Sequence, residues 1–296
     1  MTLFKQTLFI LSFIFLTSCQ FSKDKEIKEV KERPKPVRKY EKPKEFTYSI
    51  WSLKNDSIRK VFNSKYSTSE LTTIVALNRI DKNTLQQADS LLIPTEFDDD
   101  FLAYSPFPYA LLKLEVVPKI AIFSYPLQAY GLYEYGELVK WGPTSLGSKA
   151  HPTPTGLFFT NWKGEEVQST VDDEWILRWN FNIANKDGVG WHQYNLPGYP
   201  ASHSCLRLLE DDAKWMYDWA DEWILEDENT VLAKGTPVIV FGKYDFDGKL
   251  MIFKLINDSK AISITEKELN DLVSKHLPEI IKEQKKRENI EKIMEL

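Results

Sequence analysis

The region from Lys119 to Gly147 consists of three short runs that are rich in aromatic and β-branched residues. They are KIAIFSY (119–125), QAYGLYEY (128–135) and LVKWGPTSLG (138–147), with Pro126 and Gly136 at the breaks. Runs of this length and composition favour β-strands, and the short breaks leave room only for tight turns. The sequence therefore predicts an antiparallel meander here rather than a fold built on helical crossovers.

Further strand and helix signals follow the meander. The prolines of HPTPTGLFFTNW (151–162) predict a turn that enters another strand, and KGTPVIVFGKYDF (234–246) is apolar enough for a buried closing strand. Between them, Trp215, Trp219 and Trp223 are spaced by four residues, which predicts one apolar helix face. We expect an α+β fold that is mainly β, with helices, and a domain over residues 117–245.

The overall composition limits the partners. The chain has 296 residues, of which 43% are hydrophobic, so it is long enough to bury a full core. Its 38 basic and 43 acidic residues give a formal net charge of −5. This balance supplies no positive field for a polyanion, and we expect no nucleic-acid partner.

The first nineteen residues, MTLFKQTLFILSFIFLTSC, place Lys5 before an apolar run from Thr7 to Leu16. The run is too short to span a bilayer and suits the apolar part of a secretory signal peptide. Its end, LTSC, resembles the lipobox of bacterial lipoproteins, which implies lipidation of Cys19. The resemblance and the following Gln20 predict a periplasmic protein held by lipid at the outer membrane. An ordinary secretory peptide and a buried helix remain alternatives.

Residues 20–45 alternate lysine with glutamate and include Pro34, Pro36 and Pro43. Such a segment buries too little apolar surface to offset the entropy of ordering it, so it predicts a disordered tether. A solvated charged helix is the alternative, and the prolines disfavour it.

Residues 46–96 have the composition of a small globular module. Helical spacing follows plausible caps at Asn55 or Asp56 and at Ser67 or Thr68, and SLLIP (90–94) predicts a short strand stopped by Pro94. The expected order of strand, helix, helix and strand resembles a degenerate LysM module, which implies binding to the glycan strands of peptidoglycan. A structural module without glycan binding is the alternative. Residues 97–116 are expected to form a connector, and residues 246–296 a strand and a helix, with a break or kink of the helix at Pro278.

The stretch PGYPASHSCLRL (197–208) gathers the side chains best suited to nucleophilic chemistry. If Cys19 is lipidated, Cys205 has no partner for an intramolecular disulfide, and an unpaired thiol outside the cytoplasm suggests chemistry. A cysteine nucleophile needs a nearby base, since a free thiol is only a few per cent ionised at neutral pH. His203 and His192 precede Cys205 and could fold back toward its sulfur. A buried structural cysteine is the alternative from spacing alone, and zinc binding is disfavoured because no paired ligand spacing accompanies Cys205.

The longer stretch WHQYNLPGYPASHSCLRL (191–208) resembles the catalytic motif of the YkuD family of L,D-transpeptidases. TPTG (153–156), GTPVIV (235–240) and the stretch from Leu127 to Gly147 resemble further landmarks of the family, in the same order. The resemblance covers residues 117–242 and implies a β-sandwich catalytic domain. It also implies an enzyme that acts on peptidoglycan stem peptides, without a metal or other cofactor.

The resemblance also implies roles for single residues. Cys205 matches the nucleophile, and His192 is the first choice for the general acid/base, with Gln193 offering a carbonyl that orients its ring. The backbone N–H groups of Ser204 and Cys205 would form an oxyanion hole. The remaining expected site residues are His203 and Ser202, which would support the loop, and Arg207, which would order the loop, bind a substrate carboxylate or form a structural salt bridge.

Ser204 departs from the family pattern, which usually has glycine at this position. Glycine there suggests either a positive φ or a close approach of substrate. The sequence therefore leaves two functions open: an L,D-transpeptidase or the related L,D-carboxypeptidase, and a catalytically silent wall-binding lipoprotein that kept the fold. An active enzyme would be acylated on Cys205 by a carbapenem.

Overall fold

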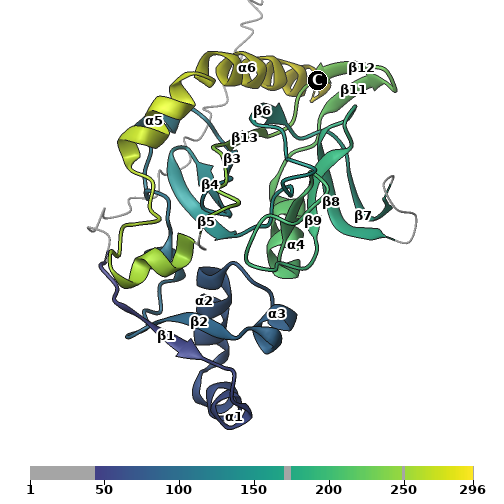
Figure 1. Cartoon of the computed structure of the whole chain (residues 1–296). Coiled ribbons are helices and arrows are strands. Elements are labelled where there is room, and N and C mark those ends of the chain that lie inside the picture. The colour runs from purple at the N-terminus through teal and green to yellow at the C-terminus, as the bar shows by residue number, and fades with distance from the viewer. Residues whose placement is uncertain (1–43, 170–174, 249–250, 296) are drawn as a thin grey trace, which may run out of the picture. The chain divides into compact units, whose positions relative to one another are not determined.

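The computed structural model describes residues 44–169, 175–248 and 251–295 (Figure 1). The predicted signal peptide, the lipidation site at Cys19 and all but the last two residues of the predicted tether lie outside these ranges. Those two residues form ion pairs: Lys44 with Asp98 and Glu45 with Lys260. In the described part of the chain, no helix is both long and apolar enough to cross a membrane.

The predicted meander forms three strands of a five-stranded sheet. It consists of β3 (Ile120–Ser124), β4 (Ala129–Glu134) and β5 (Glu137–Pro143), paired antiparallel in sequence order. The predicted closing strand is β13 (Pro237–Phe241), which inserts between β3 and β6 (Gly156–Phe159). It runs parallel to β3 and antiparallel to β6. The sheet order is therefore β5-β4-β3-β13-β6.

A second sheet of four strands has the order β10-β9-β8-β7. Its strands are β7 (Lys163–Gln168), β8 (Ile176–Ala184), β9 (Val189–Gln193) and β10 (Leu206–Leu208). Strands β9 and β10 are parallel, and the irregular segment 194–205 connects them. This arrangement puts the predicted catalytic loop between two neighbouring parallel strands.

Helix α4 (Glu210–Trp219) follows β10 directly. The prediction that Trp215, Trp219 and Trp223 share one helical face is wrong for Trp223, because the helix ends at Trp219. The chain then forms a hairpin of β11 (Ile224–Asp227) and β12 (Thr230–Ala233).

The core of the domain lies between the two sheets. Alternate side chains of β3 and β13, such as Phe123 and Val240, pack against Phe181 of β8 and Trp191 of β9, and α4 adds Met216. Side chains alternate along a strand, so every second side chain of β3 and β13 enters this core. The side chains between them point to the opposite face of the five-stranded sheet. The α+β, mainly β fold class is confirmed.

The opposite face of the five-stranded sheet is also covered. Helices α5 (Glu266–Ser274) and α6 (Leu277–Met294) contribute Leu269, Val273 and Ile280 to a second core layer. The short helices η1 (Phe101–Tyr104) and η2 (Leu112–Leu114) of the expected connector contribute Tyr104 and Leu114. A sheet covered on both faces needs nearly continuous apolar strands, as β3 shows.

The expected C-terminal strand is absent from the described part of residues 246–295. The apolar run MIFKLI instead forms the 3₁₀ helix η3 (Met251–Ile256). Ile252 and Leu255 are three residues apart, so a 3₁₀ turn brings both against Leu92, whereas a strand would send them to opposite faces. Beyond η3 the chain forms α5 and α6, and α6 begins at the Pro278 break that the sequence predicted.

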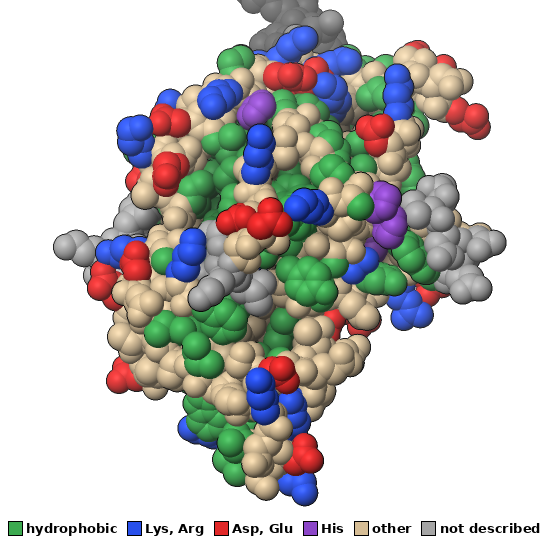
Figure 2. Space-filling model, in the orientation of Figure 1, with side chains coloured by type: hydrophobic (Ala, Val, Ile, Leu, Met, Phe, Trp, Pro, Cys, Tyr) green, Lys and Arg blue, Asp and Glu red, His purple; other side chains and the backbone are tan. Residues whose placement is uncertain are grey.

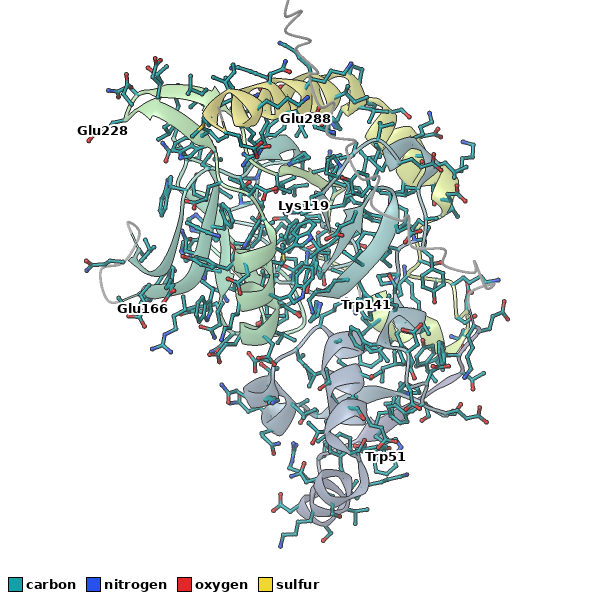
Figure 3. The ribbon with its side chains drawn as sticks, turned by 180° about the vertical axis from the view of Figure 1, so that it is seen from behind. Trp51, Lys119, Trp141, Glu166, Glu228 and Glu288 are labelled. Carbon is teal, nitrogen blue, oxygen red and sulfur yellow. The ribbon has the colours of Figure 1, made fainter. Side chains whose placement is uncertain are left out.

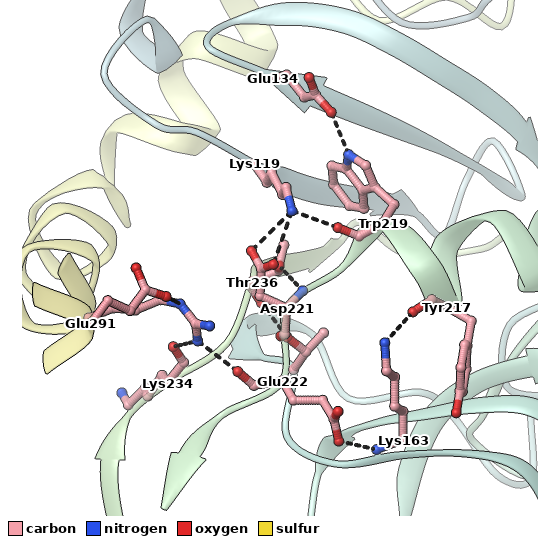
Figure 4. A network of polar contacts seen from close by, with 12 residues as sticks. Lys119, Glu134, Lys163, Tyr217, Trp219, Asp221, Glu222, Lys234, Thr236 and Glu291 are labelled. Atoms are coloured by element: carbon pink, nitrogen blue, oxygen red, sulfur yellow. Dashed lines mark hydrogen bonds and ion pairs between the residues drawn. The ribbon is translucent and has the colours of Figure 1, made fainter. Parts of the chain in front are cut away.

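A polar network ties α6 to the end of α4 and to β13 (Figure 4). Lys119 donates to the carbonyl of Trp219 and pairs with Asp221 at 3.0 Å. Arg287 of α6 donates to the carbonyls of Glu222 and Lys234. The network anchors the C-terminal helix on the side of the domain away from the N-terminal module (Figure 1).

Residues 46–96 form the predicted module around a core of their own. Strands β1 (Tyr48–Ser52) and β2 (Ser90–Pro94) pair antiparallel, and α1 (Asp56–Lys65), α2 (Thr68–Asn78) and the short α3 (Lys82–Gln87) lie between them. The third helix was not expected. Asn55 caps α1, Ser67 forms a capping box at α2, and Asp81 caps α3. The relation of this module to LysM stays a prediction.

The module contacts the domain of residues 117–245 at the end of α2. Arg79 has a positive φ of 59° and ends the helix, and its guanidinium is fully buried. It donates to the carbonyl of Leu127 at 2.9 Å and lies 5.5 Å from the ring of Trp141, which Figure 3 labels. A buried guanidinium needs partners of this kind, because an unpaired one would lose its hydration without compensation.

Candidate active site

A hollow of about 340 Å³, open to solvent, lies over β8, β9 and β10. Five of the residues that the sequence singled out line it: His192, Ser202, His203, Cys205 and Arg207. The rest of its lining consists of Ser169 after β7, Trp175 and Leu177 around the start of β8, and Tyr194 just after β9. The structure thus brings the predicted side chains together in one cleft.

Strand alternation explains how His192, Cys205 and Arg207 reach the same face. In the parallel pairing of β9 with β10, Leu206 lies opposite Trp191 and Arg207 opposite His192. Trp191 and Leu206 point into the core and are completely buried. Their neighbours therefore point to the other face, where the hollow lies. A shift of one residue in this register would bury the arginine and expose the core residues.

His192 is nearly completely buried, and its ring is oriented by one hydrogen bond. Its Nδ1 lies 2.9 Å from the carbonyl oxygen of Gln193, the contact that the sequence suggested. A carbonyl oxygen only accepts, so Nδ1 carries the proton and Nε2 is left as the acceptor. The pKa of His192 is lowered to about 4, mainly by burial and to a smaller extent by the charge of Arg207, while the Gln193 carbonyl opposes the shift. The ring is consequently neutral near pH 7.

Cys205 is a free, half-buried cysteine at the entrance to β10. Its Sγ lies 3.8 Å from the carbonyl oxygen of Gly188, toward which the thiol donates. Burial raises the pKa of the Cys205 thiol, and the Gly190 N–H and the charge of Arg207 oppose this rise. The resting group is therefore a thiol, and its proton has to be removed for the sulfur to act as a nucleophile.

Gly190 permits the close approach of β9 to β8 beside this thiol. A Cβ at Gly190 would lie 2.5 Å from the carbonyl oxygen of Phe181, so a larger residue would push the strands apart. No sequence pattern had singled out Gly190 as a site residue.

The backbone around the cysteine is held by hydroxyl groups. Ser202 is buried, and its Oγ donates to the carbonyl of Cys205 at 2.5 Å. Thr153 Oγ1 donates to the carbonyl of Ser204 at 2.8 Å and accepts from the N–H of Gly147 at 2.7 Å. Ser204 has a φ of 78°, the positive value that the glycine of related sequences implies. The serine thus occupies a strained conformation that the neighbouring contacts keep in place.

His203 lies at the exposed rim of the hollow rather than beside the buried ring of His192. Its ring stacks on that of His151 with centroids 4.3 Å apart, and Trp175 meets it edge-on at 5.6 Å. Histidine side chains gather at this part of the surface in Figure 2. His151 was not among the predicted site residues, because it lies about fifty residues away in the chain, and only the fold brings it next to His203.

Arg207 contacts the ring of Tyr194, with its guanidinium carbon 4.4 Å from the ring centroid. None of the ion pairs within the described ranges involves Arg207. This cation–π contact takes the place of the structural salt bridge that the sequence left open. The guanidinium remains available to an anionic group in the hollow.

The site offers no group of ligands for a metal. Among the described residues, no cluster of three or more histidine, cysteine, aspartate or glutamate side chains is placed to hold one.

Comparison with known proteins bears on the same region. Residues 118–240 match the family model YkuD, described as the L,D-transpeptidase catalytic domain. This region is similar to a YkuD domain. The match includes β3 to β13, and with them every residue that lines the hollow.

Solved L,D-transpeptidase structures are also similar to this chain. They include the enzyme from Stackebrandtia nassauensis (20% identity, TM-score 0.35), one from Mycobacterium smegmatis (22%, 0.34) and L,D-transpeptidase 3 from Mycobacterium tuberculosis (19%, 0.34). The similarity covers 43%, 42% and 42% of this chain and 57%, 59% and 61% of theirs. No curated protein sequence matches the chain.

Thr153→Val should loosen the catalytic loop. The substitution keeps the shape of the side chain but leaves the N–H of Gly147 and the carbonyl of Ser204 without their partner, which costs about 1–3 kcal/mol. We expect a lower midpoint of thermal unfolding and faster hydrogen exchange in the loop. Thr153→Ser retains the hydroxyl and serves as the control, so equal effects of both substitutions would contradict the role of this hydrogen bond.

The neutral, buried state of His192 predicts a pH dependence of stability. Since its folded pKa of about 4 lies below the ordinary 6.5, the unfolded chain binds more protons between these values. The free energy of unfolding should therefore fall as the pH drops from 6.5 to 4, by up to about 3 kcal/mol from this group. Chemical denaturation across this range would measure it. A His192→Gln variant should lack this component, and parallel pH curves for the two proteins would refute the prediction.

Proposed function

We propose that this chain is a peptidoglycan L,D-transpeptidase that uses Cys205 as its nucleophile. The observation that carries the proposal is the placement of Cys205 and a neutral His192 on one face of paired strands, within one hollow of a region similar to a YkuD domain. A buried structural cysteine would instead point into the core, as Leu206 does.

The first half of the proposed reaction forms an acyl-enzyme. The Cys205 sulfur attacks the carbonyl carbon on the L-centre of the third residue of a stem tetrapeptide, and His192 Nε2 accepts the thiol proton. The S–C bond forms, the C–N bond to the terminal D-alanine breaks, and the histidine returns its proton to the departing amine. Because the resting pair is neutral, proton transfer accompanies the attack rather than preceding it.

The loop would stabilise the negative oxygen that forms during the attack. Backbone N–H groups of Ser204 and Cys205 are the proposed donors, and the contacts of Ser202 and Thr153 fix the carbonyls of Cys205 and Ser204. Loss of one such donor typically raises a reaction barrier by about 2.7–4 kcal/mol. Arg207 would bind a carboxylate of the stem peptide.

In the second half, an amine of a neighbouring stem peptide attacks the thioester carbonyl, and the S–C bond breaks as the new amide forms. Water as the acceptor would make the enzyme an L,D-carboxypeptidase. The alternative function is a catalytically silent wall-binding protein, for which the strained Ser204 is the specific observation.

The N-terminal sequence completes the proposal. A lipid on Cys19 would anchor the protein at the outer membrane, with the enzyme in the periplasm. Residues 20–45 would tether the enzyme to this anchor. The module of residues 46–96 would contact glycan strands.

The test uses the purified chain without its first nineteen residues, mixed with muropeptides that carry tetrapeptide stems. Cross-linked dimers in the mass spectrum would show a transferase, and tripeptides alone would show a carboxypeptidase. Cys205→Ala should abolish both products, and His192→Ala should lower turnover by several orders of magnitude with the fold retained. No product from the wild-type chain would favour the silent alternative, and full activity of His192→Ala would reassign the base.

Ser204→Gly should change the acylation rate by less than tenfold, which corresponds to about 1.4 kcal/mol. Glycine removes the steric cost of the positive φ but adds backbone entropy to the unfolded chain, so the free energy of unfolding changes little, and the backbone N–H that is the proposed oxyanion donor is kept. The rate is measured as the mass adduct formed on Cys205 with a carbapenem. Ser204→Ala is the control that keeps Cβ and removes only the hydroxyl. An adduct in Ser204→Gly but none in wild type would identify a silenced enzyme.

A further inference from the structure

The catalytic loop, residues 194–205, is held by two different parts of the chain. Its second half is fixed by the catalytic domain: Ser145 Oγ donates to the carbonyl of Tyr199 at 2.7 Å, and the N–H groups of Ala201 and Ser202 donate to the carbonyl of Leu146. The hydrogen bonds that residues 195–198 form within the described chain go instead to the N-terminal module.

Asp81 makes these contacts. Its backbone N–H donates to the carbonyl of Leu196 at 3.1 Å, and its Oδ2 accepts from the N–H of Leu196 at 2.7 Å. Both polar backbone groups of Leu196 are thereby satisfied by one residue, while the Leu196 side chain is completely buried. The second carboxylate oxygen, Oδ1, caps α3 by accepting from the N–H of Thr84 at 2.7 Å. One carboxylate therefore joins the start of α3 to the catalytic loop.

The neighbouring residues extend this contact. Ile80 pairs with Pro197 in an isolated antiparallel bridge. Gly198 has a φ of 94°, and a Cβ there would lie 3.3 Å from Ile80 Cγ2 and 3.4 Å from the carbonyl oxygen of Asn78. The loop thus follows the surface of the module closely over three residues, at a position where glycine provides both the conformation and the space.

Asp81 is itself held in place from the catalytic domain. Two residues before it, the buried Arg79 donates to the carbonyl of Leu127 and lies over Trp141. Leu209, which follows β10, packs against the core of the module. The segment that carries Cys205 is consequently bounded on both sides, at Leu196 and at Leu209, by contacts with residues 46–96.

We propose that Asp81 is a positioning residue for catalysis: it fixes the first half of the catalytic loop so that the backbone of Ser204 and Cys205 is held ready for the substrate. The N-terminal module then positions the catalytic loop in addition to the glycan contact proposed for it. The Asp81–Leu196 clamp, by which we mean the two hydrogen bonds between these residues, follows from the contacts alone. Its effect on turnover rests on the proposed function.

Asp81→Ser separates the two roles of the carboxylate. A serine hydroxyl still caps α3, but its shorter side chain with one oxygen cannot also accept from the N–H of Leu196. The matched control is Ser67→Ala, which removes the cap of α2 at an exposed position of the same module without contact to the loop. Thermal unfolding of both variants shows that each is folded and by how much each is destabilised.

Two measurements test the proposal in the chain without its first nineteen residues. Hydrogen exchange of the peptide that covers residues 194–205 should be at least tenfold faster in Asp81→Ser than in wild type, and unchanged in Ser67→Ala. The maximal rate of Cys205 acylation by a carbapenem should fall at least fivefold in Asp81→Ser with the half-saturating concentration little changed, and should stay at the wild-type value in Ser67→Ala. A general loss of stability would not produce this split between the two variants.

If hydrogen exchange of residues 194–205 is unchanged in Asp81→Ser, or increases equally in both variants, the Asp81–Leu196 clamp does not hold the loop. Faster exchange with a wild-type rate of acylation would overturn the positioning role. If wild type itself is not acylated, the proposed function fails, and alkylation of Cys205 by iodoacetamide then replaces acylation as the readout. In that case a change of the alkylation rate in Asp81→Ser alone supports the positioning of the cysteine, and its absence contradicts it.

Discussion

The parallel pairing of β9 with β10 is the constraint on which the site depends. Two adjacent parallel strands need a crossover connection of about a dozen residues, and in most folds a helix provides it. Here the irregular segment 194–205 makes the connection, so its backbone groups find no partners within a helix. They are satisfied instead by Asp81, Ser145, Leu146 and Thr153, which lie in distant parts of the chain. The conformation of the loop therefore requires that the rest of the fold is already in place.

The same pairing sets the electrostatics of the site. The register puts His192 and Cys205 against the body of the sheet, where burial disfavours the charged form of each. Arg207, on the same face, shifts both groups toward the deprotonated form but does not outweigh the burial of the thiol. The result is a neutral imidazole and a neutral thiol in the lining of the same hollow.

Much of the architecture could be predicted because it depends on local patterns. The meander, the closing strand, the caps at Asn55 and Ser67 and the break at Pro278 all follow from turn residues and from the spacing of apolar residues. The failures arise where packing overrides such patterns. MIFKLI has the composition of a strand, but Ile252 and Leu255 pack with Leu92, and a 3₁₀ turn brings both to that surface. Trp223 continues a spacing of four residues, yet the helix has already ended at Trp219.

The sequence by itself determined which groups are the candidates for chemistry, because the thiol, the imidazole and the guanidinium occur within one stretch of chain with the spacing of a known motif. It also indicated the strain at Ser204 through the departure from glycine. Only the tertiary structure decided which groups surround them. His151 and Thr153 reach the site across about fifty residues, and Asp81 reaches the loop across more than one hundred. No local pattern encodes such contacts, because they exist only after strands distant in sequence have paired and the module has packed against the loop.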